Sequence, residues 1–259
     1  AQQAGDLGLL YQSQWQQARL YSRMGRADDS LRAYRLAVQS LQPIKDRITD
    51  SRFRRRGPFP HSDGSIYLEF ADQLLKSTDT LQGKTERQQR LVEARQTMEM
   101  QKEAELQDYF RDSCLTNAKA NISVIDEAIG PRTAIIYPIL LADRTELLVS
   151  FKDGIQRYVV DKSAQQVTEQ VRALRTKLEK RRTRDYLPYS QRLYKWLIEP
   201  LEVDLHAREI NTLVMVSGQS LRTIPLSVFH DGEQFLVNRY ALATTPRLTL
   251  THASPLKPK

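Results

Sequence analysis

Cys114 is the only cysteine in the chain, and a thiolate paired with a histidine is a common nucleophile for cleaving peptide bonds. No histidine lies close to Cys114 in the sequence, and three of the four histidines, His206, His230 and His252, follow it. We therefore expect Cys114 to be a small buried apolar residue. A single cysteine also excludes an intrachain disulfide framework and a cysteine-based zinc site, and it favours the cytoplasm.

Other reactive patterns are missing from the sequence. The chain contains neither of the glycine-rich patterns that cradle phosphates, and its four histidines do not have the spacing of metal ligands. Carboxylate pairs such as Asp28-Asp29 and Asp126-Glu127 are interpreted as helix-end or surface features. The sequence thus predicts no catalytic residue, no cofactor-binding residue and no metal ligand.

Two basic clusters could bind phosphates or an acidic partner, since the formal net charge is +8. The first is Arg54-Arg55-Arg56, within a stretch from Thr49 to Gly64 whose prolines and glycines predict a loop. We favour a solvated surface for both clusters and regard nucleic-acid binding as unlikely, because no aromatic residues interleave with the second one. That second cluster comprises Arg172, Arg175, Lys177, Lys180, Arg181, Arg182 and Arg184.

The first part of the chain has helical periodicity. A helix from Leu7 to Met24 is broken at Gly25 and followed by a second helix from Asp29 to about Ile48. The spacing of small and aromatic residues resembles one tetratricopeptide repeat of about 34 residues, with Pro43 one position late. The residues that carry this resemblance are Ala18, Tyr21, Gly25, Ser30, Tyr34 and Ala37.

A second helical pair follows, from Ile66 to Leu81 and from Lys84 to Phe110. The sequence predicts a helical region over 1–120, with repeat-like pairs at about 11–48 and 66–110, and an α/β domain over 121–259. Two pairs are fewer than repeat stacks usually need, so either earlier repeats are missing or these helices pack on the next domain. The apolar stripes are Tyr67, Phe70, Ala71 and Leu74, then Leu91, Ala94, Met98 and Leu106.

From Thr133 the pattern becomes that of strands. The segments from Ala134 to Leu141, Thr145 to Phe151 and Ile155 to Val160 predict a meander, with Asp153-Gly154 at its second turn. Pro138 inside the first segment favours an edge strand or a bulge, because proline cannot donate to a sheet ladder.

Helices then alternate with strands, which is typical of an α/β layer. Ser163 should cap a helix whose stripe is Val167, Val171, Leu174 and Leu178. A second helix from Tyr189 to Glu199 should bury Leu193, Trp196 and Leu197, end at Pro200, and connect through Leu201–Glu209 to a buried strand at Leu213–Val216.

The segment from Ile210 to Leu250 has the highest density of strand and turn signals. Pro225 should start a short helical segment, and His230-Asp231-Gly232 should form a tight reversal in which His230 is a turn residue. Two β-prone runs follow it, Phe235–Val237 and Tyr240–Thr244.

From about Thr133 to Leu250 the chain resembles the first half of the CHAT domain. The resemblance rests on the order of its features: an apolar strand, a turn, then L-x-x-I-P-L, D-G, F-L-V-N-R-Y-A-L and T-P. Ser217-Gly218-Gln219 replaces the usual Pro-Asp-Gly. The resemblance implies a caspase-like sheet with covering helices, related to separase and often found behind tetratricopeptide repeats in bacterial-type proteins. In that family the proposed catalytic histidine and cysteine lie in the second half, in motifs resembling H-x-x-x-H-G and S-A-C-x-T-G.

Lys259 comes before either motif, so the resemblance implies a truncated, inactive scaffold fragment and leaves open whether the full-length protein is a cysteine endopeptidase. The partner would be a protein or peptide bound through the helical region. The alternative is a non-enzymatic adaptor with a degenerate CHAT-like platform. We also expect self-association through an unpaired sheet edge and no membrane association, because no apolar run has the length of a membrane span.

Overall fold

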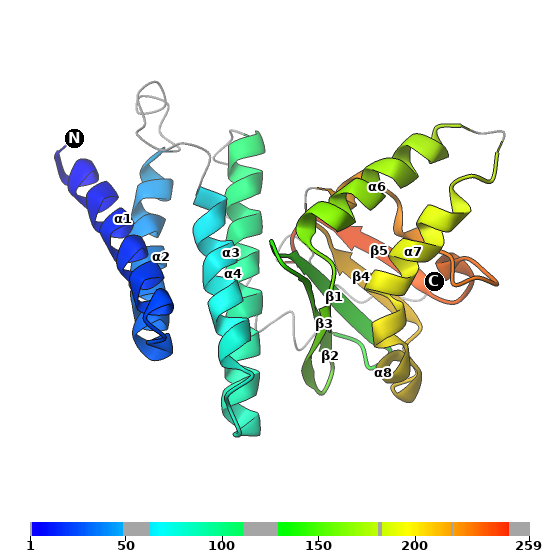
Figure 1. The fold of residues 1–259 in the computed structure, drawn as a ribbon, viewed down its shortest axis with the longest axis horizontal. Helices are drawn as coiled ribbons and strands as arrows, with labels where there is room; N and C mark the ends of the chain where they lie inside the picture. Colours follow the sequence, from blue (N-terminus) through cyan, green and yellow to red (C-terminus); the bar gives the residue numbers. More distant parts are fainter. Residues whose placement is uncertain (1, 49–62, 111–128, 181–182, 219, 249–259) are drawn as a thin grey trace, which may run out of the picture. The chain divides into compact units, whose positions relative to one another are not determined.

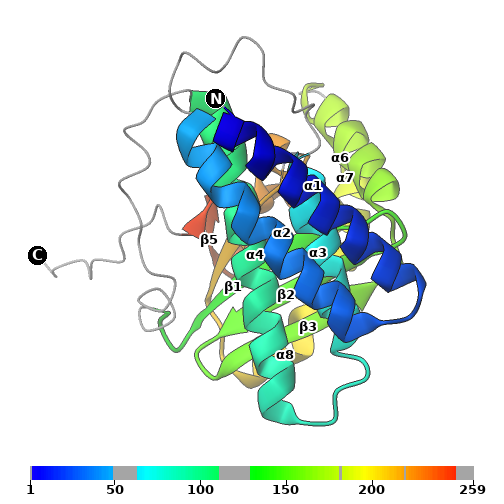
Figure 2. The same ribbon diagram turned by 90° about the vertical axis from the view of Figure 1, so that its left-hand side faces the viewer.

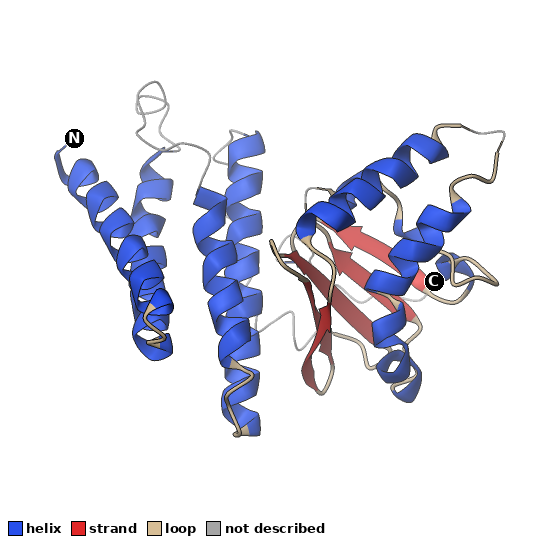
Figure 3. Ribbon diagram, viewed as in Figure 1, coloured by secondary structure: helices blue, strands red, loops and turns tan. Residues whose placement is uncertain are grey.

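The computed structural model describes residues 2–48, 63–110, 129–180, 183–218 and 220–248. The chain divides into two compact units, residues 1–119 and residues 120–259 (Figure 1). The first unit is helical, and the second contains a mixed sheet with helices packed on it (Figure 3). This arrangement confirms the predicted fold class, in which helical hairpins precede an α/β sheet with covering helices.

The first helical hairpin consists of α1 (Gln2–Arg23) and α2 (Ala27–Ile48), which lie side by side in Figures 1 and 2. Gly25 has φ +72°, a conformation that favours glycine and allows the tight connection between the two helices. Small residues let the helices approach, because Ala18 and Ser30 are fully buried and the Ser30 hydroxyl donates to the Ala18 carbonyl at 2.9 Å.

The second hairpin consists of α3 (Asp63–Ser77) and α4 (Lys84–Phe110). The predicted loop was too long at its end, since Asp63 and Gly64 begin α3, while 49–62 lies outside the described residues. The helix also ends before the predicted Leu81, in a tighter turn where the N–H groups of Thr78 and Asp79 donate to carbonyls three residues back. The predicted apolar stripes are buried where their side chains are described: Tyr67, Phe70, Ala71, Leu74, Leu91, Ala94 and Met98.

The second unit is built on a five-stranded sheet in the order β3-β2-β1-β4-β5. Antiparallel pairing joins β1 (Thr133–Leu140) to β2 (Thr145–Phe151) and β2 to β3 (Gly154–Val160), which confirms the predicted meander. Parallel pairing joins β1 to β4 (Thr212–Val216) and β4 to β5 (Ala241–Thr245). Among the described residues β3 and β5 are the edge strands, and self-association through an edge stays a prediction.

The prediction that Pro138 marks an edge strand or a bulge is wrong, because β1 is the central strand. Leu141 N–H donates to Arg144 O at 2.8 Å, so in the alternating antiparallel ladder the nitrogen of Pro138 faces away from β2. On that other side the register with β4 stops at Ile136. Proline is therefore tolerated because no ladder hydrogen bond is required at this position.

Helices α6 (Ala164–Leu178), α7 (Leu187–Leu197) and α8 (Glu202–Ala207) follow the meander, and Figure 1 shows α6 and α7 on one side of the sheet. Ser163 caps α6 as predicted, in a reciprocal capping box with Gln166. The core on this side joins residues of β1, β2 and β4 to Val167, Val171, Leu174, Leu193 and Leu197.

The structure tests four local expectations. The connector Leu201–Glu209 contains α8, and Val214 within the strand predicted to be fully buried is half-buried. Pro225 precedes a short 3₁₀ turn, Leu226–Val228, as its cap. The β-prone run Phe235–Val237 becomes a 3₁₀ turn, Leu236–Asn238, because Leu236 N–H donates to Phe229 O at 2.7 Å and its side chain is buried in the core.

Candidate functional site

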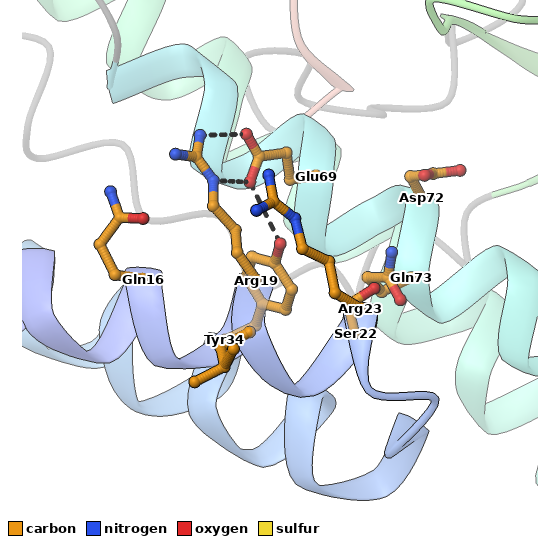
Figure 4. A pocket seen from close by; sticks show the side chains of 9 residues that line it. Gln16, Arg19, Ser22, Arg23, Tyr34, Glu69, Asp72 and Gln73 are labelled. Carbon is orange, nitrogen blue, oxygen red and sulfur yellow. Dashed lines mark hydrogen bonds and ion pairs between the residues drawn. The ribbon is translucent and has the colours of Figure 1, made fainter.

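An open pocket of about 600 Å³ lies in the helical unit between α1, α2 and α3 (Figure 4). Helix α1 supplies one wall and α3 the other, while Tyr34 of α2 closes the base. Eight of its nine lining residues are polar or charged, although the carbon atoms of their side chains also contribute to its surface. The lining residues are Gln16, Arg19, Leu20, Ser22, Arg23, Tyr34, Glu69, Asp72 and Gln73.

The Glu69 cluster fixes the walls of this pocket. The Glu69 carboxylate on α3 accepts hydrogen bonds from Trp15 Nε1 at 2.8 Å and from Arg19 Nε and Nη2 at 2.9 and 2.5 Å. It also accepts one from the Tyr34 hydroxyl at 3.1 Å. One carboxylate thereby joins α1, α2 and α3, and the paired Arg19–carboxylate geometry adds directional specificity.

Electrostatics in the Glu69 cluster follow from these contacts. Burial alone would raise the pKa of Glu69, but hydrogen bonds from Arg19 and Trp15 outweigh it and hold the pKa below its usual value. Burial, together with the negative charge of Glu69, raises the pKa of the Tyr34 hydroxyl. Arg19 also lies over the Trp15 ring at 4.1 Å, so its charge is fully engaged within the cluster.

Three of the remaining polar side chains that line the pocket have no partner and could bind a ligand, whereas Asp72 is paired. Asp72 forms an ion pair with Lys76 at 2.7 Å, one turn further along α3. Within the described part of the chain, by contrast, no hydrogen bond or ion pair engages the side chains of Gln16, Arg23 and Gln73. Figure 4 shows the Arg23 side chain reaching from α1 towards α3. The pocket therefore combines braced walls with unsatisfied donors and acceptors.

A second polar cluster lies in the α/β unit around Arg239. Its guanidinium donates to Glu202 Oε1 at 2.7 Å, to the Tyr194 hydroxyl at 2.9 Å and to Asp231 Oδ2 at 3.2 Å. Its other terminal nitrogen lies 3.0 Å from His206 Nε2. Burial opposes the charge of Arg239, but the hydrogen bond with Glu202 and the electrostatic attraction of Tyr194, Tyr240 and Glu202 together outweigh it and raise the pKa of the guanidinium. This Arg239 cluster fastens α7 and α8 to the turn at Asp231.

That turn has the predicted form. Gly232 has φ +120°, and the Asp231 side chain accepts hydrogen bonds from the N–H groups of Glu233 and Gln234, both at 2.7 Å. His230 Nδ1 accepts from Gly232 N–H at 3.0 Å, and its ring packs edge-on against Phe235. His230 is thus a turn residue.

Comparison with known families bears on this part of the chain. The model of the CHAT domain family matches residues 187–259. This stretch is similar to the CHAT domain family. The finding confirms the relationship expected from the sequence, although the match begins later than Thr133. No curated protein matches the chain.

The CHAT segment contains α7, α8, β4 and β5, together with the whole Arg239 cluster. Every charged group of that cluster is paired with another member. The similarity to the CHAT domain suggests that this segment is related to caspase-like peptidases. The described hydrogen bonds of this segment hold helices and turns in position, and its sequence contains no cysteine.

The residues that the sequence singled out for chemistry have different outcomes. Cys114, His252 and Arg54-Arg55-Arg56 lie outside the described residues. In the second basic cluster, Arg172 and Arg175 are exposed on α6, and Arg175 lies 3.7 Å from Glu179. The described part of the chain has no group of acidic, histidine and cysteine side chains that could hold a metal.

None of the helices in the described ranges combines the length and apolar composition that a membrane span requires.

The pocket itself was not predicted from the sequence. Its residues are scattered polar positions on three helices, and no local sequence pattern distinguishes them from polar residues that face solvent.

Proposed function

We propose that the helical unit binds an extended segment of a partner protein in the pocket between α1 and α3, and that the CHAT-family unit is its scaffold. The observation that carries this proposal is the pocket, whose walls are braced by the Glu69 cluster while Gln16, Arg23 and Gln73 remain unpaired. Because the Glu69 cluster fixes the two walls, binding does not have to order the helices themselves, which lowers its cost.

The size and position of the pocket agree with a peptide ligand. Its volume of about 600 Å³ accommodates a few side chains, and clefts between helices are common ligand sites. The two walls come from the first helix of each hairpin, so a segment lying along the pocket would contact both hairpins. The repeat-like spacing of Ala18, Tyr34 and Ala37 supports the same role, because it builds the hairpin that presents α1.

A peptide-display experiment tests this proposal. Random octapeptides are selected on residues 1–259, and the enriched pool is rebound to Gln16→Ala and Gln73→Ala, whose side chains line the pocket. Gln17→Ala is the matched control, because Gln17 is adjacent on α1 but bonds to Tyr21 and does not line the pocket. Loss of binding in the pocket variants alone supports the proposal, while equal binding to all variants contradicts it.

The scaffold role is tested separately by assaying peptide cleavage. On this proposal residues 1–259 do not hydrolyse a fluorogenic casein substrate, because the histidine and cysteine motifs expected of the family are not in the sequence. The control is Cys114→Ala, which removes the only thiol. Cleavage by the unmodified chain that disappears in Cys114→Ala would contradict a purely structural role.

A further inference from the structure

The charges of the pocket point to the chemistry of its partner. Resting on the proposed function, we infer that the pocket takes a segment with an acidic residue and an apolar residue separated by one position. The acidic side chain faces Arg23 and the apolar one faces Leu20.

Among the charged side chains that line the pocket, only Arg23 has no partner within the described residues. Arg19 and Glu69 neutralise each other at 2.5 Å, and Asp72 is paired with Lys76 at 2.7 Å. Arg23 is exposed, lines the pocket and has no acidic partner among the described residues. The four charged lining residues sum to zero, but Arg23 is the one among them with no partner within the described residues, so a carboxylate on the bound segment complements it locally.

The position of Arg23 does not by itself explain why its guanidinium is unpaired. It lies in the last turn of α1, where a positive charge interacts favourably with the helix dipole. That interaction leaves the forked donors of the guanidinium free, and their geometry matches a carboxylate. A single free cation is a weak site for nucleic acid, which needs several phosphate contacts for affinity, so an acidic protein segment is the better match.

Leu20 supplies the apolar half of the inference. Its side chain is 56% exposed although leucine is costly to leave in water, and it lines the same pocket three residues before Arg23. Residues three apart on a helix have Cβ atoms about 5–6 Å apart. Alternate side chains on one side of an extended peptide repeat at roughly 6.5 Å, so an acidic and an apolar residue with one position between them match this spacing.

The unpaired amides on both walls define how the backbone of such a segment is held. Gln16 on α1 and Gln73 on α3 each carry one acceptor oxygen and two donor hydrogens. A peptide group offers the complementary donor and acceptor, so these side chains can bind backbone without regard to sequence. Selectivity for particular side chains of the bound segment then comes from Arg23 and Leu20.

The test uses two labelled octapeptides on the full chain, identical except that one carries Asp and the other Asn two positions from a single Leu. Fluorescence anisotropy at low salt should show up to about fivefold tighter binding of the Asp peptide, because an exposed ion pair contributes at most about 1 kcal/mol. The preference should decrease at high salt, because an exposed ion pair is screened. Arg23→Gln should abolish it, and Arg23→Glu should reverse it.

Arg172→Glu is the matched control, because it makes the same charge change on an exposed helical arginine in the other unit. An Asp preference that survives in Arg23→Gln, or that Arg172→Glu also removes, would overturn the inference. Equal binding of both peptides that is still lost in Gln73→Ala would overturn the acidic specificity and leave the peptide-binding pocket standing. Binding of neither peptide, together with failure of the display selection, would remove both.

Discussion

The Glu69 cluster and the Arg239 cluster are built on the same plan with opposite charge. Glu69 accepts hydrogen bonds from α1 and α2, and Arg239 donates to α7, α8 and the turn at Asp231. Each uses one side chain with several hydrogen-bonding atoms to fasten segments from different secondary-structure elements. They differ in their surroundings. The Glu69 cluster lines an open pocket whose other side chains include unpaired groups, whereas the charged side chains of the Arg239 cluster pair with one another.

The comparison shows that a dense polar network is not evidence of a site by itself. The Arg239 cluster lies in the segment that matches the CHAT family, yet its hydrogen bonds are internal and hold helices in place. The Glu69 cluster has the same mechanical role, and the functional candidates are its unpaired neighbours. Arg23 and Gln73 matter because the cluster positions them without bonding to them.

The largest effect should come from Arg239→Ala. Glu202 and Asp231 would lose their common cationic partner, and the Arg239 side chain is only 18% exposed. We expect the free energy of unfolding to fall by about 2 kcal/mol, less than for a fully buried pair because solvent compensates in part. Urea denaturation followed by the fluorescence of Trp196 in a Trp15→Phe background measures this change.

Arg172→Ala is the control for that experiment, because this exposed side chain has no ion pair within the described residues. Its unfolding free energy should stay within about 0.5 kcal/mol of the unmodified chain. Equal stability of Arg239→Ala would show that the Arg239 cluster does not hold α7 and α8 to the turn.

Glu69→Gln should have the next largest effect. The substitution keeps an acceptor oxygen for Trp15 but removes the charge that pairs with Arg19, whose side chain is 36% exposed. We expect a loss of about 1 kcal/mol in the helical unit, since part of the pair is already screened by solvent. Urea denaturation followed through Trp15 in a Trp196→Phe background detects it, and an unchanged midpoint would contradict the bracing role.

The two clusters should also share a dependence on pH. Hydrogen bonds hold the pKa of Glu69 and of Asp231 below their usual values despite burial. A carboxyl group with a lowered folded pKa stabilises the protein above its unfolded pKa, so this stability is lost as the pH falls below about 4. Glu69→Gln should flatten the acid limb of the Trp15 transition and leave that of the Trp196 transition unchanged. Parallel flattening of both would contradict separate clusters.

Arg23→Gln should have the smallest effect on stability. Its side chain is exposed and makes no ion pair within the described part of the chain, so we expect a change within about 0.5 kcal/mol. A loss as large as that of Glu69→Gln would place Arg23 in the bracing network and would contradict the distinction between the cluster and its unpaired neighbours.

Much of the fold could be predicted because the signals are local. The stripe of Val167, Val171 and Leu174 and the Ser163 cap identify α6, and the meander follows from alternating strands with Asp153-Gly154 between them. The failures have tertiary causes. Pro138 lies in the central strand because its partner β4 is short, and the β-prone Phe235–Val237 bends into a turn to bury Leu236.

The candidate site could not be predicted in the same way. Its residues come from three helices, and a polar residue that lines a pocket has the same sequence signature as one that faces solvent. Glu69 illustrates this, because nothing in the sequence shows that Trp15, Arg19 and Tyr34 all direct donors at it.

The sequence by itself determined the two-part fold, the helical hairpins, the Asp231-Gly232 turn and the relationship to the CHAT family, because periodicity, caps and turn residues act over a few positions. Tertiary structure alone decided the strand order, the bracing of three helices by Glu69, and which charge in the pocket remained unpaired. These depend on distances between residues far apart in the chain, which no local pattern encodes.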